Sequence, residues 1–94
     1  MDSQRCEELR DEVMRAEVAG DISEFHALNC QAMLVAVEEP ALSQDYLDMA
    51  DALAASPSDR AVVATTAAVC DELRRNATGH HEDRRSIAVA ALRH

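Results

Sequence analysis

Hydrophobic residues recur every three or four positions along almost the whole chain, which is the spacing of one face of an α-helix. The pattern predicts helices over residues 3–19, 22–38, 42–55, 58–75 and 82–92. Gly20, Pro40, Pro57 and a turn signal at residues 76–79 separate them. Since short connections join antiparallel neighbours, the sequence predicts an all-α fold, a four- to five-helix antiparallel bundle in a single domain over residues 1–94.

The second predicted helix is apolar on every side over residues 32–37. A helix without a polar face lies at the centre of a fold or against another subunit. The other large apolar residues of the helical stripes are also expected to be buried: Leu9, Val13, Phe25, Met33, Leu34, Leu47, Met49, Leu53, Val62, Val69 and Leu73. Because so small a domain has a thin core, the apolar segment also predicts a possible homodimer that shares a helix face.

The composition agrees with helices and offers no catalytic motif. Hydrophobic residues make up 48% of the 94 residues, aromatic residues only 2%, and Gly and Pro number two each. These values argue against a β-sandwich or barrel. The chain lacks the nucleophile-elbow, phosphate-loop, dinucleotide-binding and zinc-protease patterns. The sequence therefore predicts a protein that is not an enzyme and needs no cofactor.

The charge is strongly acidic and uneven. Eighteen acids face nine arginines, giving a net charge of −9, and thirteen of the acids precede residue 55. Such a surface repels nucleic acid and anionic membranes, so the expected partner is another protein with a basic surface. The residues predicted to bind it are Glu7, Glu8, Asp11, Glu12, Asp45, Asp48 and Asp51. The alternative is a solvated acidic face that only keeps the protein in solution.

The cysteines and the polar start of the chain indicate where the protein works. Three cysteines, far apart and odd in number, do not form a disulfide framework, which favours a reducing compartment. The first residues are polar and acidic, unlike a secretory signal, and no apolar run approaches the length of a membrane helix. The sequence predicts a cytoplasmic protein without a membrane segment.

Cys6, His26, Cys30 and Met33 form an alternative, metal-binding hypothesis. The last three stand at i, i+4 and i+7, so one helix face carries an imidazole, a thiol and a thioether, which are ligands for Zn or Cu. The order Cys…His-x3-Cys-x2-Met resembles the zinc-containing anti-sigma factor domain, differing at Met33, where that family has a cysteine. The resemblance implies a zinc site and a sigma factor as partner. Cys and Met are equally ordinary core residues.

His26 also begins a second, shorter resemblance. The run His26-Ala27-Leu28-Asn29-Cys30 is similar to the His-x-Leu-Lys-Gly pattern of phosphotransfer domains, with Asn29 and Cys30 in place of Lys and Gly. That resemblance implies a phosphoryl-accepting histidine on a four-helix bundle. Taken together, the sequence predicts a small acidic protein-interaction module, a regulator or inhibitor that docks on a basic surface. The alternatives are a metal- or redox-responsive helical protein and a structural subunit of a homo-oligomer.

Overall fold

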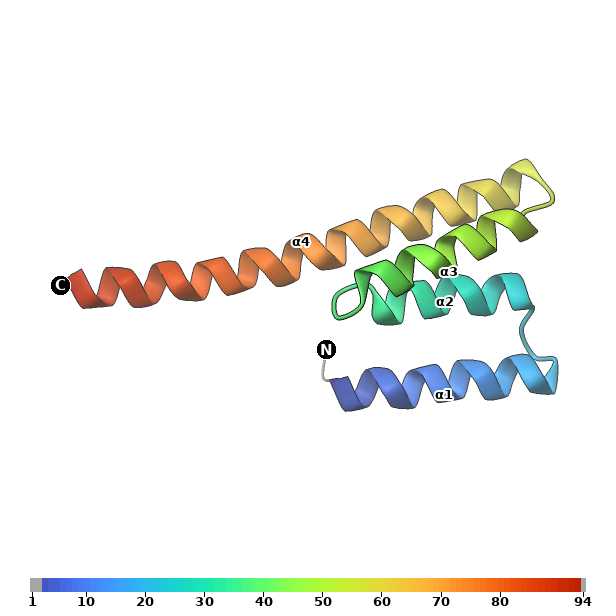
Figure 1. Cartoon of the computed structure of the whole chain (residues 1–94), viewed down its shortest axis with the longest axis horizontal. Helices are drawn as coiled ribbons and strands as arrows, with labels where there is room; N and C mark the ends of the chain where they lie inside the picture. The colour runs from blue at the N-terminus through green and yellow to red at the C-terminus, as the bar shows by residue number, and fades with distance from the viewer. Residues whose placement is uncertain (1–2, 94) are drawn as a thin grey trace.

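The computed structural model describes the backbone of residues 3–93 and the side chains of residues 4–77. Within residues 3–93 the elements are all helical: α1 (Ser3–Ala19), α2 (Glu24–Val35), α3 (Pro40–Leu53) and α4 (Pro57–Arg93). Successive helices run antiparallel (Figure 1). The predicted all-α antiparallel bundle is confirmed, with four helices.

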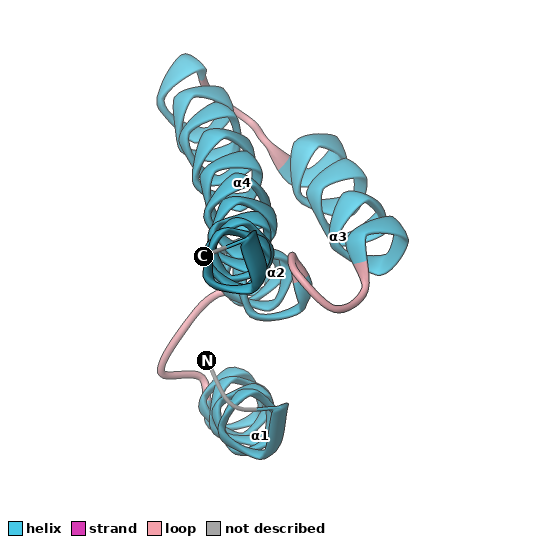
Figure 2. Cartoon of the chain, turned by 90° about the vertical axis from the view of Figure 1, so that its left-hand side faces the viewer, coloured by secondary structure: helices cyan, strands magenta, loops and turns pink. Residues whose placement is uncertain are grey.

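α2 lies at the centre of the fold. It packs against α1, α3 and α4, and α3 also packs against α4, whereas α1 has its backbone close to α2 alone. Seen along the helices, α1 stands apart from α3 and α4 (Figure 2). Ala32 and Ala36 are fully buried and Val35 nearly so. α2 is therefore central, as the apolar segment over residues 32–37 predicts, but the segment is not covered on every side, since Met33 and Leu34 are half-buried and Val37 is 49% exposed.

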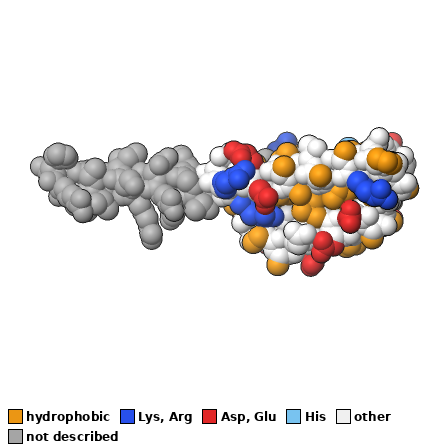
Figure 3. All heavy atoms as spheres, turned by 90° about the horizontal axis from the view of Figure 1, so that it is seen from above, with side chains coloured by type: hydrophobic (Ala, Val, Ile, Leu, Met, Phe, Trp, Pro, Cys, Tyr) orange, Lys and Arg blue, Asp and Glu red, His pale blue; other side chains and the backbone are white. Residues whose placement is uncertain are grey.

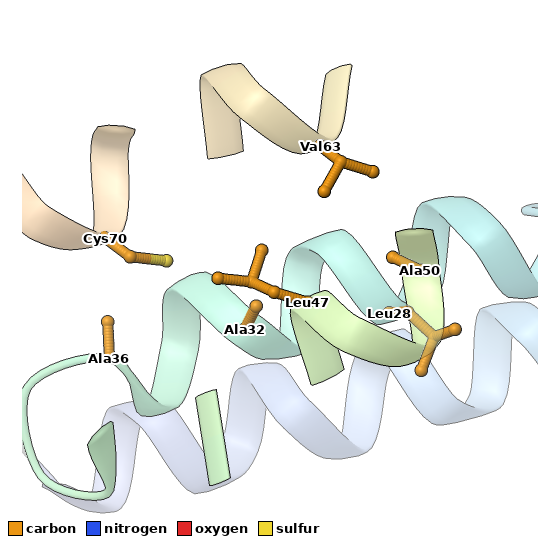
Figure 4. Close-up of a cluster of buried hydrophobic side chains, with 7 residues drawn as sticks. All are labelled: Leu28, Ala32, Ala36, Leu47, Ala50, Val63 and Cys70. Atoms are coloured by element: carbon orange, nitrogen blue, oxygen red, sulfur yellow. The ribbon is translucent and has the colours of Figure 1, made fainter. Parts of the chain in front are cut away.

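Small side chains form much of the core between α2, α3 and α4. In Figure 4 the core side chains point into the space that these three helices share: Leu28, Ala32, Ala36, Leu47, Ala50, Val63 and Cys70. Alanine at a helix contact lets two helix axes approach closely and leaves no gap, but it buries little apolar area. The core is correspondingly lean.

Several residues predicted to be buried are exposed. Leu47 is buried, and Leu9, Val13, Phe25, Met33 and Leu34 are half-buried. The prediction is wrong for five residues with exposed fractions between 38% and 49%: Met49, Leu53, Val62, Val69 and Leu73. The reason is that each outer helix meets too few neighbours to cover its whole apolar stripe. Hydrophobic side chains consequently reach the surface, as the face made by α3 and α4 shows (Figure 3).

α1 ends at a glycine turn, as the sequence predicts. Gly20 has a φ of 81°, a conformation that only glycine adopts without strain. Its N–H donates to the Glu17 carbonyl at 3.0 Å, and the N–H of Asp21 donates to the Ala16 carbonyl at 2.9 Å. This pair of bonds is a Schellman motif, which satisfies the last carbonyls of the helix. It reverses the chain so that α2 returns along α1.

The other helix boundaries differ by a few residues from those predicted. α2 begins at Glu24, two residues later than predicted, because Ser23 is its N-cap and the Ser23 hydroxyl accepts the His26 N–H at 3.1 Å. Pro40 and Pro57 each stand at the first position of a helix, where the missing N–H costs nothing. Within the described residues, no helix is long and apolar enough to cross a membrane.

The predicted turn at residues 76–79 and the separate helix over residues 82–92 are wrong. α4 continues without a break through Gly79 to Arg93. A single glycine costs a helix only about 1 kcal/mol relative to alanine, and no proline follows to stop it. At about 1.5 Å per residue, the 37 residues of α4 extend about 55 Å, close to the 57 Å length of the molecule.

Candidate functional site

One face of α2 is left open between α1 and α4. Two hollows lie along this face, each of about 410 Å³. The first lies between α1 and α2 and is lined by Leu9, Glu12, Val13, Ala16, Ile22, His26, Cys30, Met33 and Leu34. The second lies where α4 leaves the bundle and is lined by Cys6, Met33, Leu34, Val37, Glu38, Leu73, Asn76 and Ala77. Since they share Met33 and Leu34, the hollows adjoin, and we call them together the α2 groove.

The α2 groove is mainly apolar, with acidic groups on its walls. Helical spacing explains the lining, because His26, Cys30, Met33 and Val37 follow one another on the side of α2 that α3 does not cover. Glu12 of α1 lines the first hollow, and Glu38 lines the second. The arrangement can hold apolar side chains along its floor and attract positive charge at its edges.

Polar contacts of Arg10 hold the α1 wall in place. Its Nε donates to Gln31 Oε1 at 2.8 Å, and its Nη2 donates to the Tyr46 hydroxyl at 2.9 Å. Gln31 Nε2 in turn donates to the Arg10 carbonyl at 3.2 Å. The guanidinium also lies 5.9 Å from the centre of the Tyr46 ring and 3.9 Å from Glu39 Oε2. One side chain therefore connects α1 to both α2 and α3.

Arg74 holds the α4 wall of the groove in place, as Arg10 holds the α1 wall. Its Nε donates to the Ala36 carbonyl at 3.0 Å, which satisfies a backbone acceptor at the end of α2. Its Nη1 pairs with Asp71 at 2.9 Å. Beside it, the fully buried Ser43 hydroxyl donates to the Ala32 carbonyl at 2.7 Å and lies 3.7 Å from Cys70 Sγ. The bond from Arg74 to the Ala36 carbonyl fixes α4 against the end of α2, at the point where the second hollow begins.

All seven acidic residues predicted to bind a partner are exposed: Glu7, Glu8, Asp11, Glu12, Asp45, Asp48 and Asp51. Those of α1 and α3 occupy separate faces. The Tyr46 hydroxyl bonds to Arg10, so Tyr46 marks the side of α3 that faces α1. At about 100° per residue, Asp48 and Asp51 lie on the other side of α3 from Tyr46. Glu12 is the member of the set that lines the groove. A binding role for these residues stays a prediction.

The candidate metal ligands are divided between the hollows. His26, Cys30 and Met33 line the first, as their spacing predicts, whereas Cys6 lines the second. Burial raises the pKa of the Cys30 thiol above its ordinary value, which favours the neutral thiol over the metal-binding thiolate. Among the side chains of residues 4–77, no group of three His, Cys, Asp or Glu is placed to hold a metal ion. His26 itself is exposed.

Sequence analysis missed the residues that shape the groove. Leu34, Val37 and Leu73 carry no chemical signature, and the helical pattern assigns such residues to a core. Arg10 and Arg74 were likewise indistinguishable from solvated arginines. A usable signal was present in residues 32–37, because a helix that is apolar on every side must be covered all round, and the three helices beside α2 leave one of its faces open.

Comparisons with known proteins identified no relative of this chain. No family model matches the chain, and neither the curated proteins nor the solved structures searched include a match to it.

Proposed function

We propose that this protein is a protein-interaction module whose α2 groove binds an amphipathic, basic helix of a partner. The observation that carries the proposal is the open apolar face of α2, with Met33 and Leu34 at the junction of two hollows. Contiguous apolar surface of this kind, edged by polar residues, is typical of interaction sites. The module acts by binding, as a regulator or inhibitor, and performs no catalysis.

A helix is the ligand shape that suits the groove. Its walls and floor are themselves helices, whose backbone groups are satisfied internally, so an extended peptide finds no free edge with which to pair. An amphipathic helix needs no such edge, because it contributes a row of apolar side chains that fit between those of α1, α2 and α4. Each hollow is large enough for several such side chains.

The surrounding charge favours a basic ligand. Glu12 of α1 lines the first hollow and Glu38 lines the second, so each hollow has a carboxylate on its wall. With a net charge of −9, the molecule attracts basic proteins and repels nucleic acid and anionic membranes. We place the protein in the cytoplasm, where its three free cysteines, Cys6, Cys30 and Cys70, stay reduced.

Fluorescence anisotropy tests the proposal with a designed probe. The probe is a labelled helix of about five turns with leucine on one face and arginine on the other. Val37→Glu places a charge in the groove at a residue that is 49% exposed, so the fold tolerates it. Val18→Glu is the matched control, because Val18 is 90% exposed and lies outside the groove.

We expect the wild-type chain and Val18→Glu to bind the probe similarly. Val37→Glu should weaken binding about tenfold or more, equivalent to about 1.4 kcal/mol, because the new carboxylate must be desolvated. A probe with glutamate in place of arginine should not bind. Equal weakening by the two substitutions would show that the probe responds to net charge and would refute the groove as the site.

A further inference from the structure

We infer that the helix which fills the α2 groove is the C-terminal part of α4 from a second copy of this chain. In the resulting two-fold dimer, each copy places residues 78–93 of its α4 in the groove of the other. The inference rests on the proposed function, since it names the partner of the same groove. The argument uses the helical backbone and the sequence of residues 78–93, whose side chains lie outside those described.

The length of α4 provides the first argument. α4 has 37 residues, against 12 in α2 and 14 in α3. Figure 1 shows it continuing past the ends of the other three helices. At about 1.5 Å per residue, residues 78–93 extend about 24 Å and α2 about 18 Å, so the extension is long enough to lie along the whole groove of a second copy.

Charge complementarity provides the second argument. Residues 78–94 contain three arginines and two acids, together with three histidines, whereas residues 1–77 contain sixteen acids and six arginines. The extension is therefore the basic part of an acidic chain. The charge of Arg84 and Arg85 is opposite in sign to that of Glu12, which lines the groove. Opposite charges brought together in this way favour association and fix its orientation.

The apolar pattern of the extension provides the third argument. Residues 87–92 are all apolar, so this part of the helix is apolar on every side, and Arg84 and Arg85 precede it in the sequence. Apolar side chains and positive charge are the properties that suit a ligand of the α2 groove. An apolar helical segment of a lean domain gains stability when a second copy covers it.

The described part of α4 offers a seam that suits the same dimer. Leu73 lines the second hollow, and Val69 and Val62 precede it by four and eleven residues, on the same side of the helix. All three are between 38% and 43% exposed. In a two-fold dimer the two α4 helices run antiparallel, so the extension of one copy passes along this seam of the other. One association would cover both the groove and the seam.

Sedimentation equilibrium of the full chain tests the inference. Over about 1 to 100 µM we expect wild type to approach twice the mass of one chain, since dimerisation follows mass action. Val37→Glu in the groove, and Ile87→Glu with Leu92→Glu in the extension, should each weaken dimerisation about tenfold or more. Val18→Glu, the matched control outside the groove, should leave it unchanged. A monomeric wild type, or groove and extension variants that dimerise like wild type, would overturn the inference.

A second measurement separates this inference from the proposed function. The chain with Ile87→Glu and Leu92→Glu keeps its groove free, so it should bind the designed leucine–arginine helix at least as tightly as wild type does. If wild type is monomeric while this variant binds the probe, the second copy is refuted and the groove function stands. If wild type is monomeric and neither chain binds the probe, both fail. Circular dichroism of each variant establishes that it is folded.

Discussion

Arg10 of α1 donates a hydrogen bond of 2.9 Å to the hydroxyl of Tyr46 on α3, although the backbones of these two helices do not pack together. The same guanidinium bonds to Gln31 of α2 at 2.8 Å. The arginine side chain is long, and its planar guanidinium carries several N–H donors, so one arginine can bond from its own helix to two others. The position of α1, and with it one wall of the α2 groove, depends on this side chain.

Arg10→Ala should therefore destabilise the protein more than the loss of an ordinary surface arginine. It leaves the Oε1 atom of Gln31, a residue only 6% exposed, without its hydrogen-bond donor, so we expect the free energy of unfolding to fall by about 1–3 kcal/mol. Arg5→Ala is the control, since Arg5 pairs with the exposed Glu8 and should change stability by less than about 1 kcal/mol. Urea denaturation followed by circular dichroism measures both. Equal losses would contradict the role given to Arg10.

Two leucines of α3 test the position of the core. Leu47 is 5% exposed and Leu53 is 45% exposed. Leu47→Ala should lower the free energy of unfolding by about 2–5 kcal/mol, because it leaves a cavity among helices that are already close. Leu53→Ala should cost less than about 1 kcal/mol, since solvent already reaches that side chain. Denaturation midpoints in the reverse order would show that α3 packs through another face.

The two glycines should respond to alanine with opposite signs. Gly20 has a positive φ, so Gly20→Ala should destabilise the chain by about 1–2 kcal/mol. Gly79 lies within α4, where alanine is the better helix former, so Gly79→Ala should stabilise the helix by about 0.5–1 kcal/mol. Thermal unfolding followed at 222 nm compares them. A destabilised Gly79→Ala chain would restore the turn that the sequence pattern suggests at residues 76–79.

Cys30 should make the protein less stable in alkali. Burial raises the pKa of its thiol, so the folded chain keeps the proton at a pH where the unfolded chain has already released it. That contribution to stability is complete below the pKa of the unfolded thiol and is lost as the pH rises through the folded pKa. Iodoacetamide labelling of Cys30, read by mass spectrometry, should have a higher midpoint pH in the folded chain than in urea. An equal or lower midpoint would contradict this assignment.

The fold was largely predictable because it depends on a regular signal. The three-to-four-residue period identified every helical segment, and the glycine at residue 20 and the prolines at residues 40 and 57 marked the connections. The Asn-Ala-Thr-Gly run at residues 76–79 misled the prediction, because such residues are typical of a turn, whereas a single glycine costs a long helix little. Whether a turn or a continuous helix forms at residues 76–79 depends on the tertiary structure.

The groove was not predictable from the same signal. Met33, Leu34, Val37 and Leu73 have the spacing of core residues, and whether such a stripe is covered depends on where the neighbouring helices lie. Alanine and Ser43 at the contacts of α2 draw α3 and α4 together, while α1 is held at one side by Arg10. That asymmetry opens the groove, and the apolar run over residues 32–37 does not indicate which side of α2 stays open.

Methyl NMR of the chain with Ile87→Glu and Leu92→Glu, titrated with the designed leucine–arginine helix, tests the central claim most directly. Methionine and valine methyl groups lie both inside the groove, at Met33 and Val37, and outside it, at Met14 and Val18. The account predicts shifts for Met33 and Val37 that saturate with the probe, and unchanged signals for Met14 and Val18. Shifts confined to Met14 and Val18, or no saturable shift at Met33 and Val37, would contradict it.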